Sequence, residues 1–386
     1  MSAYILSGAR TPVGSFMGTL SSQSAPKLGA VAIKAALERS EIADFSLVQE
    51  VFMGLVVAAG VGQAPARQAA LGAGLPDSVP CTTINKVCGS GMKAVITGVQ
   101  TILAGDNDLV VAGGMENMSL SPHLVSMRAG HKFGPSEMKD SMQIDGLWDV
   151  YSDRAMGNCA EECAQKYNYS REMQDQLAIE SFKRSQRAIK DGVFKAEIAP
   201  VIIKDKRGET IVDTDEGPFK ANFEKIPSLR PAFSKDGTIT AANASTINDG
   251  AAALVIAGEK YKQQAQYKVV AYASHAAHPT WFTTAPVEAM KKTLKKSGLA
   301  WTDIGVFEIN EAFAVVAMNA CKELELDSEK VNIYGGGISL GHPIGASGAR
   351  IIVTLMTAMQ RKKEKYGMAG ICIGGGEALA IILESL

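Results

Sequence analysis

The stretch CGSGMKAVITGVQTILAGDNDLVVAGGME, residues 88–116, contains a glycine-rich helix start, an apolar helix and a buried strand that runs into a Gly-Gly pair. The same frame returns near the C-terminus, where SGAR at residues 347–350 begins a helix that leads to ICIGGGE at residues 371–377. The second copy is four residues longer, and the basic turn at residues 361–365 accounts for the difference. Two aligned ends on one helix–strand frame predict a duplicated domain.

Strands and helices alternate on either side of both copies. We expect strands at residues 4–7, 51–57, 109–112, 305–309 and 370–373, and helices at residues 89–103, 312–324 and 346–359. Such alternation is typical of parallel sheets joined by crossover helices, so the sequence predicts an α/β fold.

A segment of different amino-acid composition separates the two copies. It is rich in Met, Ser, Gly and Pro at residues 119–152, and it contains one clear helix, which Ser170 caps and Gly192 closes. We therefore divide the chain into a first half-domain at residues 1–117, continued by 248–267, an inserted domain at 118–247 and a second half-domain at 268–386.

Composition excludes several classes of protein. The 386 residues are 46% hydrophobic and 20% charged, and 39 Lys+Arg against 40 Asp+Glu leave a net charge of −1. No global basic field is available to hold nucleic acid or an anionic membrane, and we expect neither partner. No apolar run is expected to approach the roughly 18 residues of a membrane helix. The N-terminus lacks a signal-peptide core, and six cysteines do not make a disulfide scaffold, so we expect a cytoplasmic protein with reduced thiols.

Two residues next to glycine-rich helix starts could form a reactive pair. Cys88 begins the first copy's helix, where the helix dipole and free N–H groups favour a thiolate. His342 lies in GHPIG, residues 341–345, just before the second copy's helix. A pseudo-twofold axis would bring these helix starts face to face, and a histidine beside a cysteine commonly activates the thiol.

Two further positions stay open on the residues alone. Cys372 precedes three glycines at residues 374–376, where it could be a base or an inert core thiol. Asn310 ends a predicted strand, where it could cap the following helix or contact a ligand, because α/β sheets bind ligands at the carboxyl ends of their strands. The sequence lacks the Gly-x-Gly-x-x-Gly fingerprint and a convincing metal-ligand cluster, so no cofactor and no metal are expected.

Together, six motifs in order along nearly the whole chain resemble the thiolase family. They lie at residues 85–93, 113–119, 243–250, 310–313, 341–345 and 372–376. The resemblance implies a thiolase fold, with two half-domains in a five-layer α/β/α/β/α arrangement and an inserted domain that binds coenzyme A. It also implies a homotetramer built as a dimer of dimers. The implied reaction joins two acetyl-CoA molecules reversibly into acetoacetyl-CoA and CoA, as in short-chain members.

The resemblance also implies a role for each matching residue. Cys88, activated by His342, carries the acyl group, and Cys372 is the base, a sensible choice because an unperturbed thiol has a pKa near 8.5. The N–H groups of Cys88 and Gly374 hold the tetrahedral oxyanion, and His342 with a water on Asn310 holds the enolate oxygen. Further contacts to CoA or the acyl group are expected from Ser245, Phe233, Met156, Phe282, Phe313 and Lys220.

Some positions depart from the family pattern. Ala155 stands where short-chain members commonly have a histidine, and Pro218-Phe219 replaces a CoA-contacting arginine, with Lys220 as a possible substitute. A tyrosine that helps some relatives bind potassium also falls near Pro218, so potassium dependence is not expected.

Three alternatives compete with the interpretation as a short-chain thiolase. A degradative 3-ketoacyl-CoA thiolase of broader chain length would share every catalytic residue. A noncatalytic CoA- or lipid-binding relative would lack a cysteine or the histidine, and a decarboxylating ketosynthase would lack Cys372.

Overall fold

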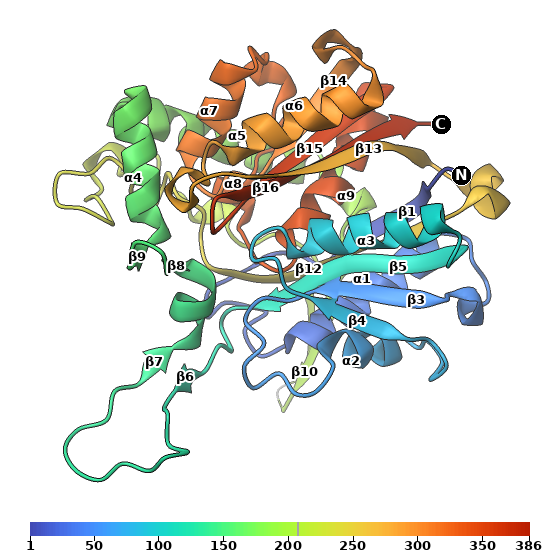
Figure 1. The fold of residues 1–386 in the computed structure, drawn as a ribbon, viewed down its shortest axis with the longest axis horizontal. Coiled ribbons are helices and arrows are strands. Elements are labelled where there is room, and N and C mark those ends of the chain that lie inside the picture. Colours follow the sequence, from blue (N-terminus) through green and yellow to red (C-terminus); the bar gives the residue numbers. More distant parts are fainter. Residues whose placement is uncertain (207) are drawn as a thin grey trace.

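The computed structural model describes residues 1–206 and 208–386, and ten strands of these residues form one continuous sheet (Figure 1). Its spatial order is β14-β15-β16-β13-β1-β12-β5-β3-β4, with the short β2 beside β12. The N-terminal half of the sheet contains β1 (Tyr4–Arg10), β2 (Gly14–Ser15), β3 (Glu50–Gly54), β4 (Cys81–Ile84), β5 (Leu109–Asn117) and β12 (Asn248–Ala257). The C-terminal half contains β13 (Tyr267–Ala276), β14 (Ile304–Ile309), β15 (Tyr366–Ile373) and β16 (Glu377–Ser385).

The two halves of the sheet repeat one pairing scheme. In the first, β12 lies between β1 and β5 as an antiparallel partner of both, and β5-β3-β4 are parallel. In the second, β16 lies between β13 and β15 in the same way, and β15-β14 are parallel. A parallel bridge between Phe307 and Val331 takes the place of β4. The predicted duplication is therefore confirmed, and it extends over whole half-domains.

Helices cover both faces of each half and produce five layers. The helices α1 (Ala25–Arg39) and α2 (Pro65–Gly72) pack on the outer face of the first half, and α6 (Ala285–Ser297) and α7 (Ala314–Glu323) pack on that of the second. Between the halves lie α3 (Ser90–Ala104) and α9 (Ser347–Lys362), which share one hydrophobic core. This is the predicted α/β/α/β/α arrangement. One feature was not predicted: β1 and β13 pair through Tyr4 with Lys268 and Ile5 with Tyr267, which joins the two halves.

The two central helices approach each other through equivalent glycines. A Cβ atom on Gly91 would lie 2.8 Å from the backbone nitrogen of Ala349, and one on Gly348 would overlap the backbone nitrogen of Met92. Larger side chains would push the helices apart at their N-terminal ends. The glycines therefore bring the two helix starts, and the loops before them, to one place.

The expectation about apolar segments needs a correction. Val87–Ala104 reaches a mean hydropathy of 1.3 over 18 residues, so one helix in the described part of the chain is long and apolar enough to cross a membrane by length and composition. The segment contains α3, which lies in the central layer against α9 and both halves of the sheet.

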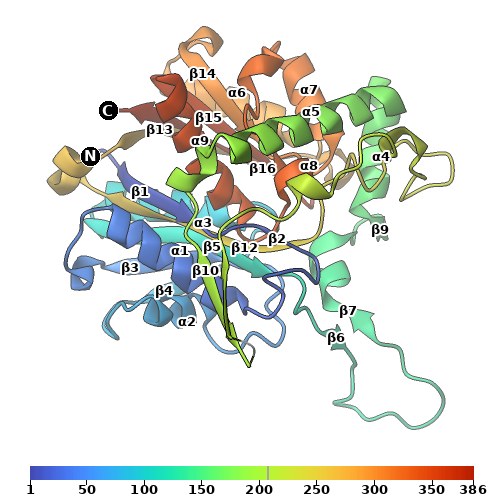
Figure 2. The same cartoon turned by 180° about the vertical axis from the view of Figure 1, so that it is seen from behind.

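The segment between β5 and β12 packs over one end of the two halves (Figure 2). It contains α4 (Met156–Tyr167), α5 (Arg171–Lys190) and the hairpins β6 (His123–Leu124) with β7 (Lys139–Asp140), β8 (Trp148–Asp149) with β9 (Arg154–Ala155) and β10 (Val201–Asp205) with β11 (Gly208–Val212). The Ser170 hydroxyl accepts a hydrogen bond from the Met173 N–H at 3.2 Å, and Gly192 has a φ of +65°, as predicted for the ends of α5. The three-part division of the chain stays our prediction.

Short helices complete the described structure. They are η1 (Phe45–Leu47), η2 (Gln143–Leu147), η3 (Val193–Ala196), η4 (Pro218–Lys220), η5 (Ile226–Ser228), η6 (Glu259–Gln264), η7 (Pro279–Trp281), η8 (Trp301–Asp303), η9 (Ser328–Lys330) and α8 (Gly337–Leu340).

Candidate active site

A cavity of about 260 Å³ lies where the inserted segment meets both half-domains. Its lining contains eight of the residues predicted from the sequence: Cys88, His342, Gly374, Ser245, Phe233, Met156, Phe282 and Phe313. These residues come from positions 88 to 374, so only the folded chain brings them together. The lining also contains residues for which the sequence predicted no role: Met118, Gly146, Leu147, Gly157, Ala244, Thr246, Ile247, Ala312 and Ile344.

The turn before α3 presents Cys88 to this cavity. Val87, directly before it, has a φ of +46°, a left-handed conformation that a β-branched side chain rarely adopts. The Ser90 hydroxyl donates to the Val87 carbonyl at 2.7 Å and accepts from the Lys86 N–H at 2.8 Å. These bonds hold the strained turn in place, and with it the position of the thiol.

The surroundings of Cys88 favour the neutral thiol. Burial raises the pKa of the Cys88 thiol to about 11, although the backbone N–H groups of Gly374 and of Cys88 itself act in the opposite direction. The prediction that the helix start favours a thiolate is therefore wrong, because burial outweighs these N–H groups. The same two N–H groups are the predicted oxyanion donors, and both face the sulfur.

His342 is buried and has one ring nitrogen with a partner. Nδ1 lies 2.6 Å from the Ser347 hydroxyl oxygen, and that hydroxyl donates its proton to the Pro343 carbonyl at 2.9 Å. The Ser347 oxygen must therefore accept from Nδ1–H, which leaves Nε2 without a proton. Nε2 has no hydrogen-bond partner among the described residues, and His342 lines the cavity. Burial, with a smaller effect of the Arg350 charge, lowers the pKa of His342 to about 3.

Cys372 lies behind the cavity, at the end of β15, and is fully buried. Burial raises its pKa well above the usual value, and the charge of a Cys88 thiolate raises it further, so the two sulfurs are close enough to interact. The prediction that Cys372 is a base with an unperturbed pKa is therefore wrong. Because Cys88 is itself neutral near pH 7, burial is the main obstacle to ionisation of Cys372.

Asn310 directly follows β14, at the carboxyl end of that strand, and its side chain is fully buried. Its backbone N–H donates to the Gly370 carbonyl at 3.0 Å, while neither atom of its amide group has a hydrogen-bond partner within residues 1–206 and 208–386. It does not cap α7, which begins after Phe313. The alternative that Asn310 caps the helix is therefore wrong, and its amide group is free to bind a ligand or a water.

Three aromatic rings form one wall of the cavity. Phe313 packs edge-on against Phe233 and against Phe282, with 6.0 Å between ring centroids in each pair. Phe282 is buried and lines the same cavity as Cys88, which fits its predicted place against the acyl group. Lys220, by contrast, lies outside the cavity, where its Nζ binds Glu216 at 2.6 Å.

Sequence reasoning missed two glutamates, each of which binds the loop of the opposite half-domain that contains Cys88 or His342. Glu116, at the end of the first copy, accepts hydrogen bonds from the N–H groups of Val56, Val57 and Gly345, the last in the loop that contains His342. Glu377, at the end of the second copy, pairs with Lys86 in the loop that contains Cys88. The sequence contains one signal for them, because the two copies end in GGME and GGGE, with a glutamate at the equivalent position. A side chain of each half-domain thus holds the loop of the other that contains Cys88 or His342.

The duplicated fold defines the class of the protein, together with a cavity that Cys88 and His342 line and the buried Cys372 and Asn310, which lie outside that lining. Residues 3–260 match the family model for the N-terminal domain of thiolase, and residues 262–385 match that for its C-terminal domain. The chain belongs to the thiolase family.

Individual relatives cover nearly the whole chain. It is 52% identical to acetyl-CoA acetyltransferase 2 of Arabidopsis thaliana, over 99% of this chain and 96% of that protein. It is 48% identical to the mitochondrial acetyl-CoA acetyltransferase of Rattus norvegicus, over 99% and 91%. The crystal structure of the Acat5 thiolase from Ascaris suum in complex with coenzyme A superposes with a TM-score of 0.95 at 45% identity, over 100% of both chains.

Proposed function

We propose that this chain is an acetyl-CoA C-acetyltransferase, which joins two acetyl-CoA molecules reversibly into acetoacetyl-CoA and CoA through an acyl-cysteine. The supporting observation is the single cavity at which Cys88, the unprotonated Nε2 of His342 and the N–H of Gly374 converge, in a chain about half identical to proteins of that name. Acetyl-CoA, acetoacetyl-CoA and CoA are thus its expected ligands.

In the first half-reaction, the neutral Cys88 thiol gives its proton to Nε2 of His342 as the sulfur attacks the thioester carbonyl. The N–H groups of Cys88 and Gly374 stabilise the oxyanion. The bond to CoA then breaks, and the departing thiolate takes the proton from His342. Acetyl-Cys88 and neutral His342 remain.

In the second half-reaction, the Cys372 thiol gives its proton to His342, and the resulting thiolate removes a proton from the methyl group of a second acetyl-CoA. The enolate oxygen then accepts from the imidazolium Nε2–H and from a water on Asn310. The enolate carbon attacks acetyl-Cys88, and His342 returns its proton to the Cys88 thiolate. All three groups are neutral again, as the pKa directions favour for the free enzyme.

We propose a preference for short acyl chains. The cavity is only about 260 Å³ in volume, and the buried rings of Phe282 and Phe313 close one side. Each further methylene group would overlap a rigid wall, at about 1–3 kcal/mol, instead of gaining roughly 0.8 kcal/mol from burial. A degradative thiolase of broader chain length is the alternative.

The test compares kcat/KM for thiolysis of acetoacetyl-CoA, 2-methylacetoacetyl-CoA and 3-ketohexadecanoyl-CoA. We expect acetoacetyl-CoA to be the best substrate, and Phe282→Ala to narrow its advantage over the longer chain. If the wild type cleaves the sixteen-carbon ester equally well, the degradative alternative replaces the short-chain assignment.

We also propose that the protein is a homotetramer. The loop between β6 and β7 extends away from the body in Figures 1 and 2. It carries large apolar side chains on its surface, among them Phe133, Met138 and Met127. Such an exposed group supports burial against further copies, and light scattering of the purified protein measures the mass directly.

A cytoplasmic location, the absence of a cofactor and independence of potassium remain predictions from the sequence. The relatives from rat and mouse are named as mitochondrial proteins, so the predicted cytoplasmic location has to be tested by cell fractionation.

A further inference from the structure

Asn310 lies on a short connection that two neighbouring side chains hold in place. The connection, residues 309–311, leaves β14 and is followed by Ala312, whose carbonyl accepts from the Ser245 N–H at 2.9 Å. Because the Asn310 amide itself has no partner among the described residues, its orientation depends on the backbone that carries it.

Asn332 forms hydrogen bonds with the residues on both sides of Asn310. Its Oδ1 accepts from the Ile309 N–H at 2.8 Å, and its Nδ2 donates to the Ile309 carbonyl at 2.9 Å and to Glu311 Oε1 at 2.8 Å. The side chain is buried, and its backbone φ of +48° is one that asparagine tolerates better than most residues. Asn332 thus uses both ends of its amide on the catalytic connection.

Glu311 continues this network into the inserted segment. Its Oε2 accepts from the Ser181 hydroxyl at 2.7 Å and from the Ile338 N–H at 3.3 Å. Ser181 belongs to α5, and Ile338 belongs to α8, which lies just before the His342 loop. A Cβ atom on Gly337, next to Ile338, would lie only 3.2 Å from Asn310 Oδ1, so α8 passes close to the Asn310 amide.

We propose that Asn332, together with Glu311, is a positioning residue for Asn310 and acts on carbon–carbon bond formation without acting on acyl transfer. The proposal rests on the proposed function, because there only the second half-reaction uses the Asn310 amide. A shift of the amide would misplace its water from the enolate oxygen, and misplacement of about 1 Å can cost about a hundredfold in rate.

The test compares two rates in each variant: exchange of labelled CoA into acetyl-CoA, which needs only Cys88 acylation, and formation of acetoacetyl-CoA. Asn332→Gly removes the amide while keeping a backbone that tolerates positive φ. Glu311→Ala removes the carboxylate, and Glu311→Gln keeps its shape and one of its two acceptor oxygens, enough to accept from Asn332 Nδ2. Asn319→Ala is the matched control, since this buried asparagine on α7 has no hydrogen-bond partner among the described residues.

For Asn332→Gly and Glu311→Ala we expect condensation to fall about 10- to 100-fold, with exchange within threefold of wild type. Glu311→Gln should recover part of the condensation rate lost in Glu311→Ala, and Asn319→Ala should leave the ratio of the two rates unchanged. Equal losses of both rates, or no loss of condensation, would overturn the positioning role. If wild type exchanges CoA but forms no acetoacetyl-CoA, the proposed function itself is wrong and the positioning role falls with it.

Discussion

The thiol of Cys88 has to lose its proton in surroundings that favour the neutral form. Burial raises its pKa to about 11, although two backbone N–H groups act in the opposite direction. His342 is likewise neutral at rest, with Nε2 as its free acceptor. In the mechanism proposed above, the pair therefore starts without charges, and the proton moves only when the thioester is attacked.

This view predicts the pH dependence of Cys88 alkylation in the absence of substrate. Iodoacetamide reacts with the thiolate, whose fraction rises about tenfold per pH unit below the thiol pKa. Because that pKa is raised, the rate of Cys88 labelling, followed by peptide mass spectrometry, should still be rising at pH 9. A plateau reached below pH 8 would mean a preformed thiolate.

Ser347 should control the proton position on His342. Ser347→Ala removes the acceptor that holds Nδ1–H, so the ring is free to carry its proton on Nε2, where it cannot act as a base. We expect Cys88 acetylation, measured by rapid quench, to slow about 10- to 100-fold. The control is Thr293→Ala, which removes a buried hydroxyl that also bonds to the carbonyl four residues earlier. If both variants acetylate at the wild-type rate, Ser347 has no such role.

At the scale of elements, the starts of α3 and α9 decide the geometry of the site. Both begin with Ser-Gly, and each serine organises the loop before it: Ser90 the turn of Cys88, Ser347 the ring of His342. The glycines let the helices meet, and Glu116 and Glu377 bind the loops from the opposite halves. The site is thus built at a pseudo-twofold contact.

Gly348→Ala should disturb this contact strongly. The added Cβ would overlap the backbone nitrogen of Met92, which cannot move without shifting α3. We expect a loss of at least about 1–3 kcal/mol, measured from the urea midpoint. Gly72→Ala is the comparison: it lies at the exposed end of α2, its only neighbour is the Ala30 Cβ at 3.1 Å, and helix propensity favours alanine there by about 0.5–1 kcal/mol. Equal midpoints for the two variants would refute the close contact.

Local patterns explain which elements the sequence could predict. The glycine-bounded helix of each copy stands out, so the bounds of α3 and α9 agree with the prediction within three residues, whereas β5 and β15 are five and four residues longer than the predicted strands. The sequence EALAIILES of β16 consists largely of strong helix formers, and only its place between β13 and β15 makes it a strand. Long-range contacts such as Asn332 with Ile309 leave no local pattern, so the supports of the site could not be found from sequence.

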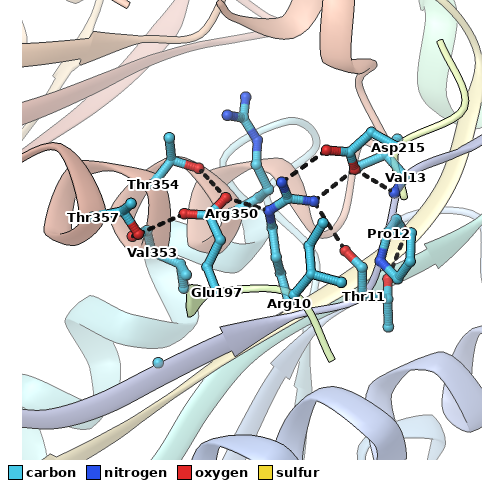
Figure 3. Close-up of polar contacts among 12 residues, drawn as sticks. Arg10, Thr11, Pro12, Val13, Glu197, Asp215, Arg350, Val353, Thr354 and Thr357 are labelled. Carbon is cyan, nitrogen blue, oxygen red and sulfur yellow. Dashed lines mark hydrogen bonds and ion pairs between the residues drawn. The ribbon is translucent and has the colours of Figure 1, made fainter. Parts of the chain in front are cut away.

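At the scale of the whole molecule, a buried charge cluster joins the inserted segment to both halves (Figure 3). Arg10, at the end of β1, binds Glu197 at 2.6 Å and both carboxylate oxygens of Asp215 at 2.7 and 2.9 Å. Glu197 also accepts from Thr354 and Thr357 of α9. Glu197 and Asp215 both belong to the inserted segment, so these bonds fix it over the central layer.

Removing the cation should loosen this connection. Arg10→Met leaves two buried carboxylates without their partner, which typically costs about 3–5 kcal/mol. We expect a clear fall in the denaturant midpoint. Lys34→Met, which breaks the exposed pair of Lys34 with Glu38, should change stability by about 1 kcal/mol or less. An Arg10→Met midpoint equal to that of Lys34→Met would show that the cluster does not hold the segment.

The most direct test of the whole account uses Cys372→Ala. The variant is incubated with acetyl-CoA, the acetyl group is mapped by peptide mass spectrometry, and acetoacetyl-CoA formation is measured beside the wild type. We predict full acetylation of Cys88, because acyl transfer needs only Cys88 and His342, with condensation lower by about 10²–10⁴-fold through loss of the base. Acetyl on another residue, no acetyl on Cys88, or condensation at the wild-type rate would contradict the account.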